Sequence, residues 1–231
     1  MNQPQQPNPK SSNQAGFTII ESLLALMVVT ILMVGLSPII VLSVATRVQA
    51  RRVELAATAA KTYVDGVRSR VIDAPEHAVA IPQTGTAPNQ TPDLNQLRTD
   101  LAGIAPPPAS TFSGTCTANS YCSNTANSSL YCIDQDETLG CQDSSMKDVI
   151  IQAYRSAGSV DQGYFLNVRV YRADAFKTSD KLKTMQADQA KANPAIGTLG
   201  NAKEPLMEMT TEISPENPNH NNFCQRLGGC S

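Results

Sequence analysis

The stretch Gly16-Phe17-Thr18-Ile19-Ile20-Glu21 opens a run that carries no charge between Glu21 and Arg47. About 20 apolar residues, each adding about 1.5 Å of helical rise, cross the hydrocarbon core of a bilayer. The apolar residues of this run occupy every face of a helix, which predicts a spanning helix and not an amphipathic surface helix. Glu21 is the exception, because a carboxylate in an apolar setting is destabilising unless a partner meets it.

Local interactions offset only part of the free-energy cost of this carboxylate. Thr18 and Glu21 have the spacing of a capping box, and an acid in the first turn complements the helix dipole. Capping contributes about 1 kcal/mol, whereas a charge inside the membrane costs about 2.5–3.5 kcal/mol by insertion scales. We therefore expect a further interaction to compensate for the carboxylate of Glu21 in the working protein.

Two simpler interpretations of the apolar run are a signal peptide and a plain anchor. A signal peptide cleaved near Ser43–Ala45 needs a basic leader and a short core, but only Lys10 precedes this long run. For an anchor, Arg47, Arg51 and Arg52 after the run would place the following domain in the cytoplasm. All six cysteines also follow the run, as is typical of an exported, oxidised domain, and we give the cysteines more weight.

The stretch from Gly16 to Glu21, with the helix that follows, resembles the prepilin motif of type IV pilins and type II secretion pseudopilins. The resemblance implies that a prepilin peptidase cuts after Gly16 and methylates the new amino terminus of Phe17. Glu21 would pair with the amine of a neighbouring Phe17 as the helices assemble. Pro38 falls where many members carry a helix proline, and a kink is expected there, although membrane helices also tolerate proline.

The same resemblance implies the location and the partners of the protein. The chain would cross the inner membrane once, with its N-terminus in the cytoplasm and its head in the periplasm, before it joins a pilus or pseudopilus. Its partners would be membrane lipid before assembly, other pilins or pseudopilins through the N-terminal helix, and an inner-membrane assembly platform with its ATPase.

The implied fold class is α+β and pilin-like, with a long N-terminal helix packed on a small antiparallel sheet with disulfide-stapled loops. Apolar residues recur at three- and four-residue steps from Val53 to Val71, which predicts that the helix continues as an amphipathic rod to about Ile72. The expected parts are a leader (1–16), a transmembrane and filament-core helix (17–46), an amphipathic continuation (47–74), a Pro-rich connecting loop (75–115) and a cysteine-containing head (116–231).

Within these parts, the 75–115 segment is expected to be a long exposed connection with a short helix near Asp93–Leu101. Strands are expected to start at Val149, to run from Gly163 to Arg172, and to run from Leu206 to Ile213. In the second of these strands, alternation places Leu166, Val168 and Val170 on one face and Asn167, Arg169 and Tyr171 on the other.

The cysteines form two groups, Cys116, Cys122, Cys132 and Cys141, and then Cys224 and Cys230. Sequence alone does not select their pairing. The resemblance to pilins favours a Cys224–Cys230 bridge near the C-terminus, with the other four pairing among themselves.

No resident metal is expected. The cysteine spacing lacks the paired C-x2-C steps of structural zinc sites. The acidic turn Asp134–Thr138 has oxygens that suit calcium, which some pseudopilins bind, but it lacks the glycine and the distal glutamate of an EF-type loop. A solvated acidic turn is the favoured interpretation.

Enzymatic and nucleic-acid functions find no support in the sequence. It contains no G-x-S-x-G, H-E-x-x-H or phosphate-binding glycine loop, so no catalytic residue and no cofactor are expected. The net charge of −2 offers no basic patch for nucleic acid.

Several stretches after the prepilin motif resemble cyanobacterial pseudopilins that serve polysaccharide secretion, namely Ser37–Arg52, Asn119–Cys122, Ser129–Cys132 and Val168–Phe176. This resemblance implies a minor pilin that supports pilus assembly, gliding motility and polysaccharide release. The alternatives are a type II secretion pseudopilin for protein export, and an exported disulfide-stapled binding module on a plain membrane anchor.

Overall fold

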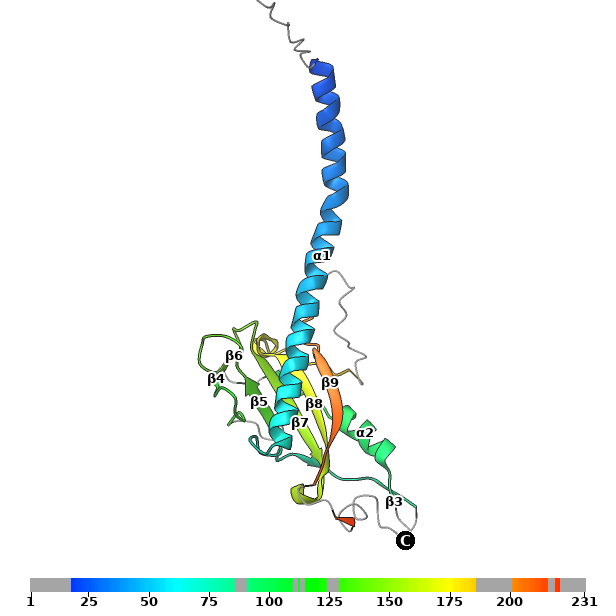
Figure 1. The fold of residues 1–231 in the computed structure, drawn as a ribbon, viewed down its shortest axis with the longest axis vertical. Coiled ribbons are helices and arrows are strands. Elements are labelled where there is room, and N and C mark those ends of the chain that lie inside the picture. The colour runs from blue at the N-terminus through cyan, green and yellow to red at the C-terminus, as the bar shows by residue number, and fades with distance from the viewer. Residues whose placement is uncertain are drawn as a thin grey trace, which may run out of the picture. The chain divides into compact units, whose positions relative to one another are not determined.

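A single helix, α1 (Ile19–Arg68), runs through 50 residues and enters both compact units of the chain, which comprise residues 1–44 and 45–231 (Figure 1). The computed structural model describes residues 18–85, 91–109, 112, 115–123, 129–185, 201–215 and 219–220. Pro38 lies inside α1 and does not end it: the residues on both sides of the proline are helical.

The second unit is built on a five-stranded sheet. Its strands are β1 (Ala78–Val79), β5 (Ser129–Ile133), β7 (Val149–Ser156), β8 (Tyr164–Arg172) and β9 (Met207–Ile213). β7 pairs with β5 and β8, and β8 pairs with β9, all antiparallel. The sequence predicted an antiparallel sheet, but the observed sheet is mixed, because β1 pairs with the end of β7 in the parallel direction.

The remaining elements are short. They are β2 (Gln83–Thr84) with β3 (Thr91–Pro92), β4 (Thr115–Cys116) with β6 (Cys141–Gln142), the helix α2 (Leu94–Gly103), and the 3-10 turns η2 (Val160–Gln162) and η3 (Ala173–Phe176).

The C-terminal half of α1 covers one face of the sheet (Figure 1). Its buried residues recur at helical spacing and meet Leu166, Val168 and Val170 of β8. The buried positions of α1 are Gln49, Ala56, Ala59, Ala60, Tyr63, Val64 and Val67. The predicted amphipathic rod is therefore confirmed up to Val67, whereas Val71 is exposed.

The helix ends at Arg68 because Arg70 adopts the left-handed conformation, with φ of 60°. The Arg70 amide donates to the carbonyl of Val67, and the Val71 amide donates to that of Gly66, which is the Schellman pattern. The expected end near Ile72 was late by one turn, since a left-handed arginine gives no sequence signal of the kind that glycine would.

α2 covers the opposite face of the sheet. Asp93 caps it by accepting from the amides of Asn95 and Gln96, at 3.1 and 2.9 Å. Leu97 and Leu101 are fully buried against Tyr154 and Phe165 of the sheet. The expectation of an exposed 75–115 connection is wrong for this part, because apolar spacing in α2 lets it pack as a third layer.

Candidate functional site

The N-terminal end of α1 holds the predicted assembly residues. The Glu21 amide donates to the Thr18 hydroxyl at 3.3 Å, and the Ser22 amide donates to the Thr18 carbonyl at 3.1 Å. Thr18 therefore caps the helix as predicted, and Glu21 lies in the first turn with its side chain exposed. Gly16 and Phe17 lie outside the described residues.

The following turns of α1 present an apolar surface on all sides. The large apolar side chains from Ile19 to Val44 are exposed, and by length and composition α1 can cross a membrane. Hydroxyl groups do not disturb this surface: Ser22 donates to the Ile19 carbonyl and Thr30 donates to the Met27 carbonyl, both at 2.8 Å. From Ile19 to Val44, Glu21 is thus the one charged side chain in an otherwise apolar helix.

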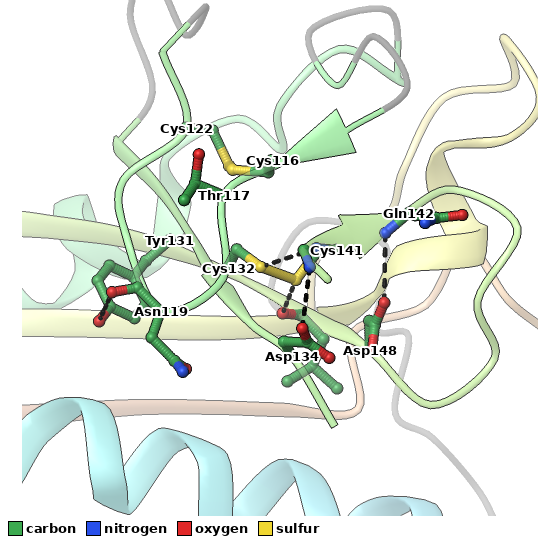
Figure 2. The surroundings of a disulfide bond; sticks show 12 residues. Cys116, Thr117, Asn119, Cys122, Tyr131, Cys132, Asp134, Cys141, Gln142 and Asp148 are labelled. Atoms are coloured by element: carbon green, nitrogen blue, oxygen red, sulfur yellow. Dashed lines mark hydrogen bonds between the residues drawn. A yellow bond between two sulfur atoms is a disulfide. The ribbon is translucent and has the colours of Figure 1, made fainter. Parts of the chain in front are cut away.

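The head carries two disulfides, both shown in Figure 2. Cys116 pairs with Cys122 and Cys132 pairs with Cys141, so the first four cysteines pair among themselves. The second bridge joins β5 to β6, with a Cα–Cα distance of 5.8 Å. Cys224 and Cys230, for which a bridge was predicted, lie outside the described residues.

Gly140 brings the two disulfides together. It precedes Cys141 with φ of 86°, and Cys141 lies opposite Cys116 in the β4–β6 ladder. A Cβ at this position would lie 2.5 Å from the Cys116 carbonyl oxygen, so the close approach of the two loops requires glycine.

The acidic turn lies against the second disulfide. Ligand oxygens of Asp134, Asp136 and Asp148 all fall within 4.8 Å of one another, which is a spacing that a cation could bridge. Asp148 follows Asp134 by fourteen residues and was not predicted as a member of this cluster. Glu137, which sequence reasoning grouped with the turn, is exposed and is not part of the cluster.

Hydrogen bonds within the loop already engage these carboxylates. Each of the six oxygens accepts one bond, and the donors are the amides of Gln135, Asp136, Thr138, Gly140 and Gln142 and the Ser145 hydroxyl. The Thr138 amide and the Ser145 hydroxyl hold the pKa of Asp136 below its ordinary value. Figure 2 shows Asp134 below the second disulfide and Asp148 bonded to Gln142, so the cluster shapes the loop next to Cys141.

Arg169 organises the face of the sheet under α2. Its guanidinium is almost fully buried and donates to the Gln152 side chain at 2.8 Å and to Glu208 at 3.1 Å. It also donates to the carbonyls of Ile104 and Ala102, at 3.0 and 2.9 Å. Burial alone lowers the pKa of Arg169, but interactions with Glu208 and Tyr171 together outweigh it and raise the pKa overall. Arg169 therefore fixes the end of α2 on the sheet.

Comparisons with known proteins match one segment of the chain to a known motif. A family model of the prokaryotic N-terminal methylation motif matches residues 11–37. No curated protein and no solved structure matches the chain. The matched motif, the apolar helix that begins within it and the α+β head together support a type IV pilin-like protein with a single N-terminal anchoring helix.

Proposed function

We propose that the protein is a minor pilin or pseudopilin subunit of a type IV pilus-like machine. The observation that carries the proposal is the position of Glu21, in the first turn of an exposed apolar helix and inside the matched methylation motif. A prepilin peptidase would cut after Gly16 and methylate Phe17, which creates a cationic amine at the start of the helix.

The proposed assembly step follows from the electrostatics of α1. When apolar helices associate, the carboxylate of Glu21 loses water, and the amine of a neighbouring Phe17 supplies the opposite charge and a hydrogen bond. A neighbour in the wrong register would leave both charges unpaired. Pro38 lacks an amide donor, and we propose that it serves as a point where the helix extends or bends.

At the finer level, we propose that the subunit supports pilus assembly, gliding motility and secretion of extracellular polysaccharide, as does the cyanobacterial hormogonium polysaccharide secretion pseudopilin. Support comes from the sequence stretches that resemble that protein, including the β8 stretch from Val168. A low-copy subunit is consistent with the six cysteines and the long 75–115 segment. The motif is typical of a structural subunit and not of an enzyme.

Mass spectrometry of the mature amino terminus tests the processing step. Methylated Phe17 as the first residue is the expected result. Thr46 as the first residue would instead indicate a cleaved export signal and would favour an exported binding module. An intact leader in the working protein would contradict the proposal.

The variant Glu21→Ala tests the pairing. It should insert into membranes as the natural protein does, but its incorporation into filaments should fall about tenfold or more, because a buried amine is left without its partner. Ser22→Ala is the matched control, since that hydroxyl bonds only within its own helix. Normal incorporation of Glu21→Ala would argue against the pairing.

The substance whose export depends on this subunit distinguishes polysaccharide secretion from type II protein secretion. Deletion of the gene should abolish gliding and polysaccharide release while export of folded proteins continues. The reverse result would identify a type II secretion pseudopilin.

A further inference from the structure

The end of the head from which α1 leaves toward Val44 carries a group of cations. Arg47 and Arg51 are exposed on α1, directly after the apolar run. Arg68 of α1 donates to the Thr211 hydroxyl of β9, close to the Tyr164–Ile213 pair at the start of β8. The other end of β8, at Arg172, and η3 directly after it therefore lie toward Arg52, sixteen residues earlier on α1.

The loop after η3 adds lysines at the same level. Lys177 and Lys181 are exposed, and within the described ranges neither ammonium has a carboxylate partner. Lys203 reaches this loop from the chain before β9 and donates to the Thr178 carbonyl at 2.8 Å. Arg172 binds Asp174 and Lys183 binds Glu204, while the exposed carboxylate of Asp180 in the same loop accepts a hydrogen bond from the Thr178 hydroxyl.

These observations define a basic collar, consisting of Arg47, Arg51, Lys177, Lys181 and Lys203. Its charge contrasts with the net charge of −2 of the whole chain. Arg47 and Arg52 are separated by five residues, which is about 7.5 Å along a helix. That length is within the Debye length of about 8 Å at physiological ionic strength, so the field of a charged surface at the level of Arg47 still reaches the level of Arg52.

We propose that the basic collar binds the anionic headgroups of the bilayer that α1 spans, and so restricts the tilt of the head before assembly. The inference rests on the proposed membrane anchoring of the subunit. Headgroup phosphates carry the charge opposite to that of the collar. Lysine and arginine side chains are attracted to an anionic surface within about a Debye length of it. Contact through the arginines of α1 alone would leave the head free to tilt relative to the bilayer, whereas contact through the loop after η3 as well gives two points of attachment.

A tryptophan reporter tests the proposal, because the chain contains no tryptophan. Ser179→Trp places the reporter on the exposed loop between Lys177 and Lys181. Thr62→Trp is the matched control on an exposed face of α1, fifteen residues beyond Arg47 and therefore about 22 Å further along the helix. Each full-length variant is reconstituted into vesicles of brominated phosphatidylcholine, with or without about one-third phosphatidylglycerol.

The expected result is bromine quenching of Ser179→Trp fluorescence only when phosphatidylglycerol is present. Adding Lys177→Gln and Lys181→Gln should reduce the quenching at least about twofold, as should about 1 M salt, where the Debye length is about 3 Å. Lys61→Gln removes a distant exposed charge and should have no effect. Equal quenching in neutral and anionic vesicles, or no quenching in either, would overturn the proposal.

Flotation of the same vesicles distinguishes this inference from the proposed function. A protein that floats with neutral vesicles but shows no lipid-dependent quenching retains its anchor and contradicts only the collar. A protein that fails to float with either vesicle contradicts the anchored subunit itself.

Discussion

The hydroxyl oxygens of Tyr63 and Tyr121 lie 2.7 Å apart and join α1 to the loop closed by the Cys116–Cys122 disulfide. Tyr121 donates its single hydroxyl proton to the Asp73 carbonyl at 2.8 Å, so Tyr63 is the donor in the tyrosine pair. Burial raises the pKa of Tyr121 well above its ordinary value, and its phenol is therefore protonated at all physiological pH values. One side chain thus connects the helix, the turn after it and the disulfide loop.

Replacing Tyr121 by phenylalanine should lower the free energy of unfolding by about 1–3 kcal/mol, because the buried Tyr63 hydroxyl loses its acceptor. Tyr131→Phe removes one bond, to the Asn119 carbonyl, and should have a smaller effect. Urea unfolding of both variants provides the measurement. A Tyr131→Phe effect equal to or larger than that of Tyr121→Phe would contradict the proposed linkage.

The two described disulfides should differ in their resistance to reduction. Cys132 and Cys141 are fully buried, whereas Cys122 is partly exposed. A water-soluble reductant should therefore open Cys116–Cys122 at least about tenfold faster, as access controls thiol exchange. Timed alkylation with peptide mass spectrometry measures both rates, and simultaneous opening of the two bridges would refute this expectation.

Removal of Arg169 should be among the most destabilising single changes in the head. Arg169→Ala leaves the buried Glu208 carboxylate without its partner, and we expect a loss of about 3–5 kcal/mol in unfolding free energy. Replacing both residues by methionine should recover much of that loss, since no unpaired charge remains. Arg98→Ala, which removes an exposed cation above the Phe165 ring, is the control and should lose about 1 kcal/mol or less.

Acid should weaken the start of α2. Hydrogen bonds from the amides of Gln96 and Asn95 and from the Thr84 hydroxyl hold the pKa of Asp93 below its ordinary value. A carboxyl with a lowered pKa in the folded state adds stability above its unfolded pKa, and this stability is lost as the pH falls through the folded pKa. The exchange rate of the Gln96 amide, divided by its intrinsic rate at each pH, should therefore increase below about pH 4.

Asp93→Asn is the matched variant for this pH dependence, because asparagine also caps helices but does not titrate. Its Gln96 exchange, corrected for intrinsic rates, should lack the acid-induced increase. The same increase in Asp93→Asn would show that another group is responsible.

Much of this fold is predictable from local patterns. The charge-free run, the helical spacing after Val53 and the alternation in β8 can each be recognised within one continuous stretch of sequence, and each matches the structure. These patterns also indicate which face of β8 meets α1.

What the patterns missed depends on contacts between distant segments. The alternation places Asn167 and Arg169 on the face opposite Leu166 but does not show what covers that face, and all nine residues of the strand are buried. α2 covers that side, and Arg169 finds its acceptors in Gln152, Glu208 and the end of α2. Asp148 joins Asp134 for a similar reason, since only the folded loop brings these carboxylates together.

The short sequence separation of both described disulfides affects the order in which the head folds. The paired cysteines are separated by only six and nine positions, whereas β5 and β7 pair with partners about twenty residues away and α1 contacts strands more than sixty residues away. Short loops close quickly and with little loss of chain entropy. If the head is exported to an oxidising compartment, as the proposed function requires, each covalent link can form before the later strands arrive, and the head then folds around loops whose shape is already set.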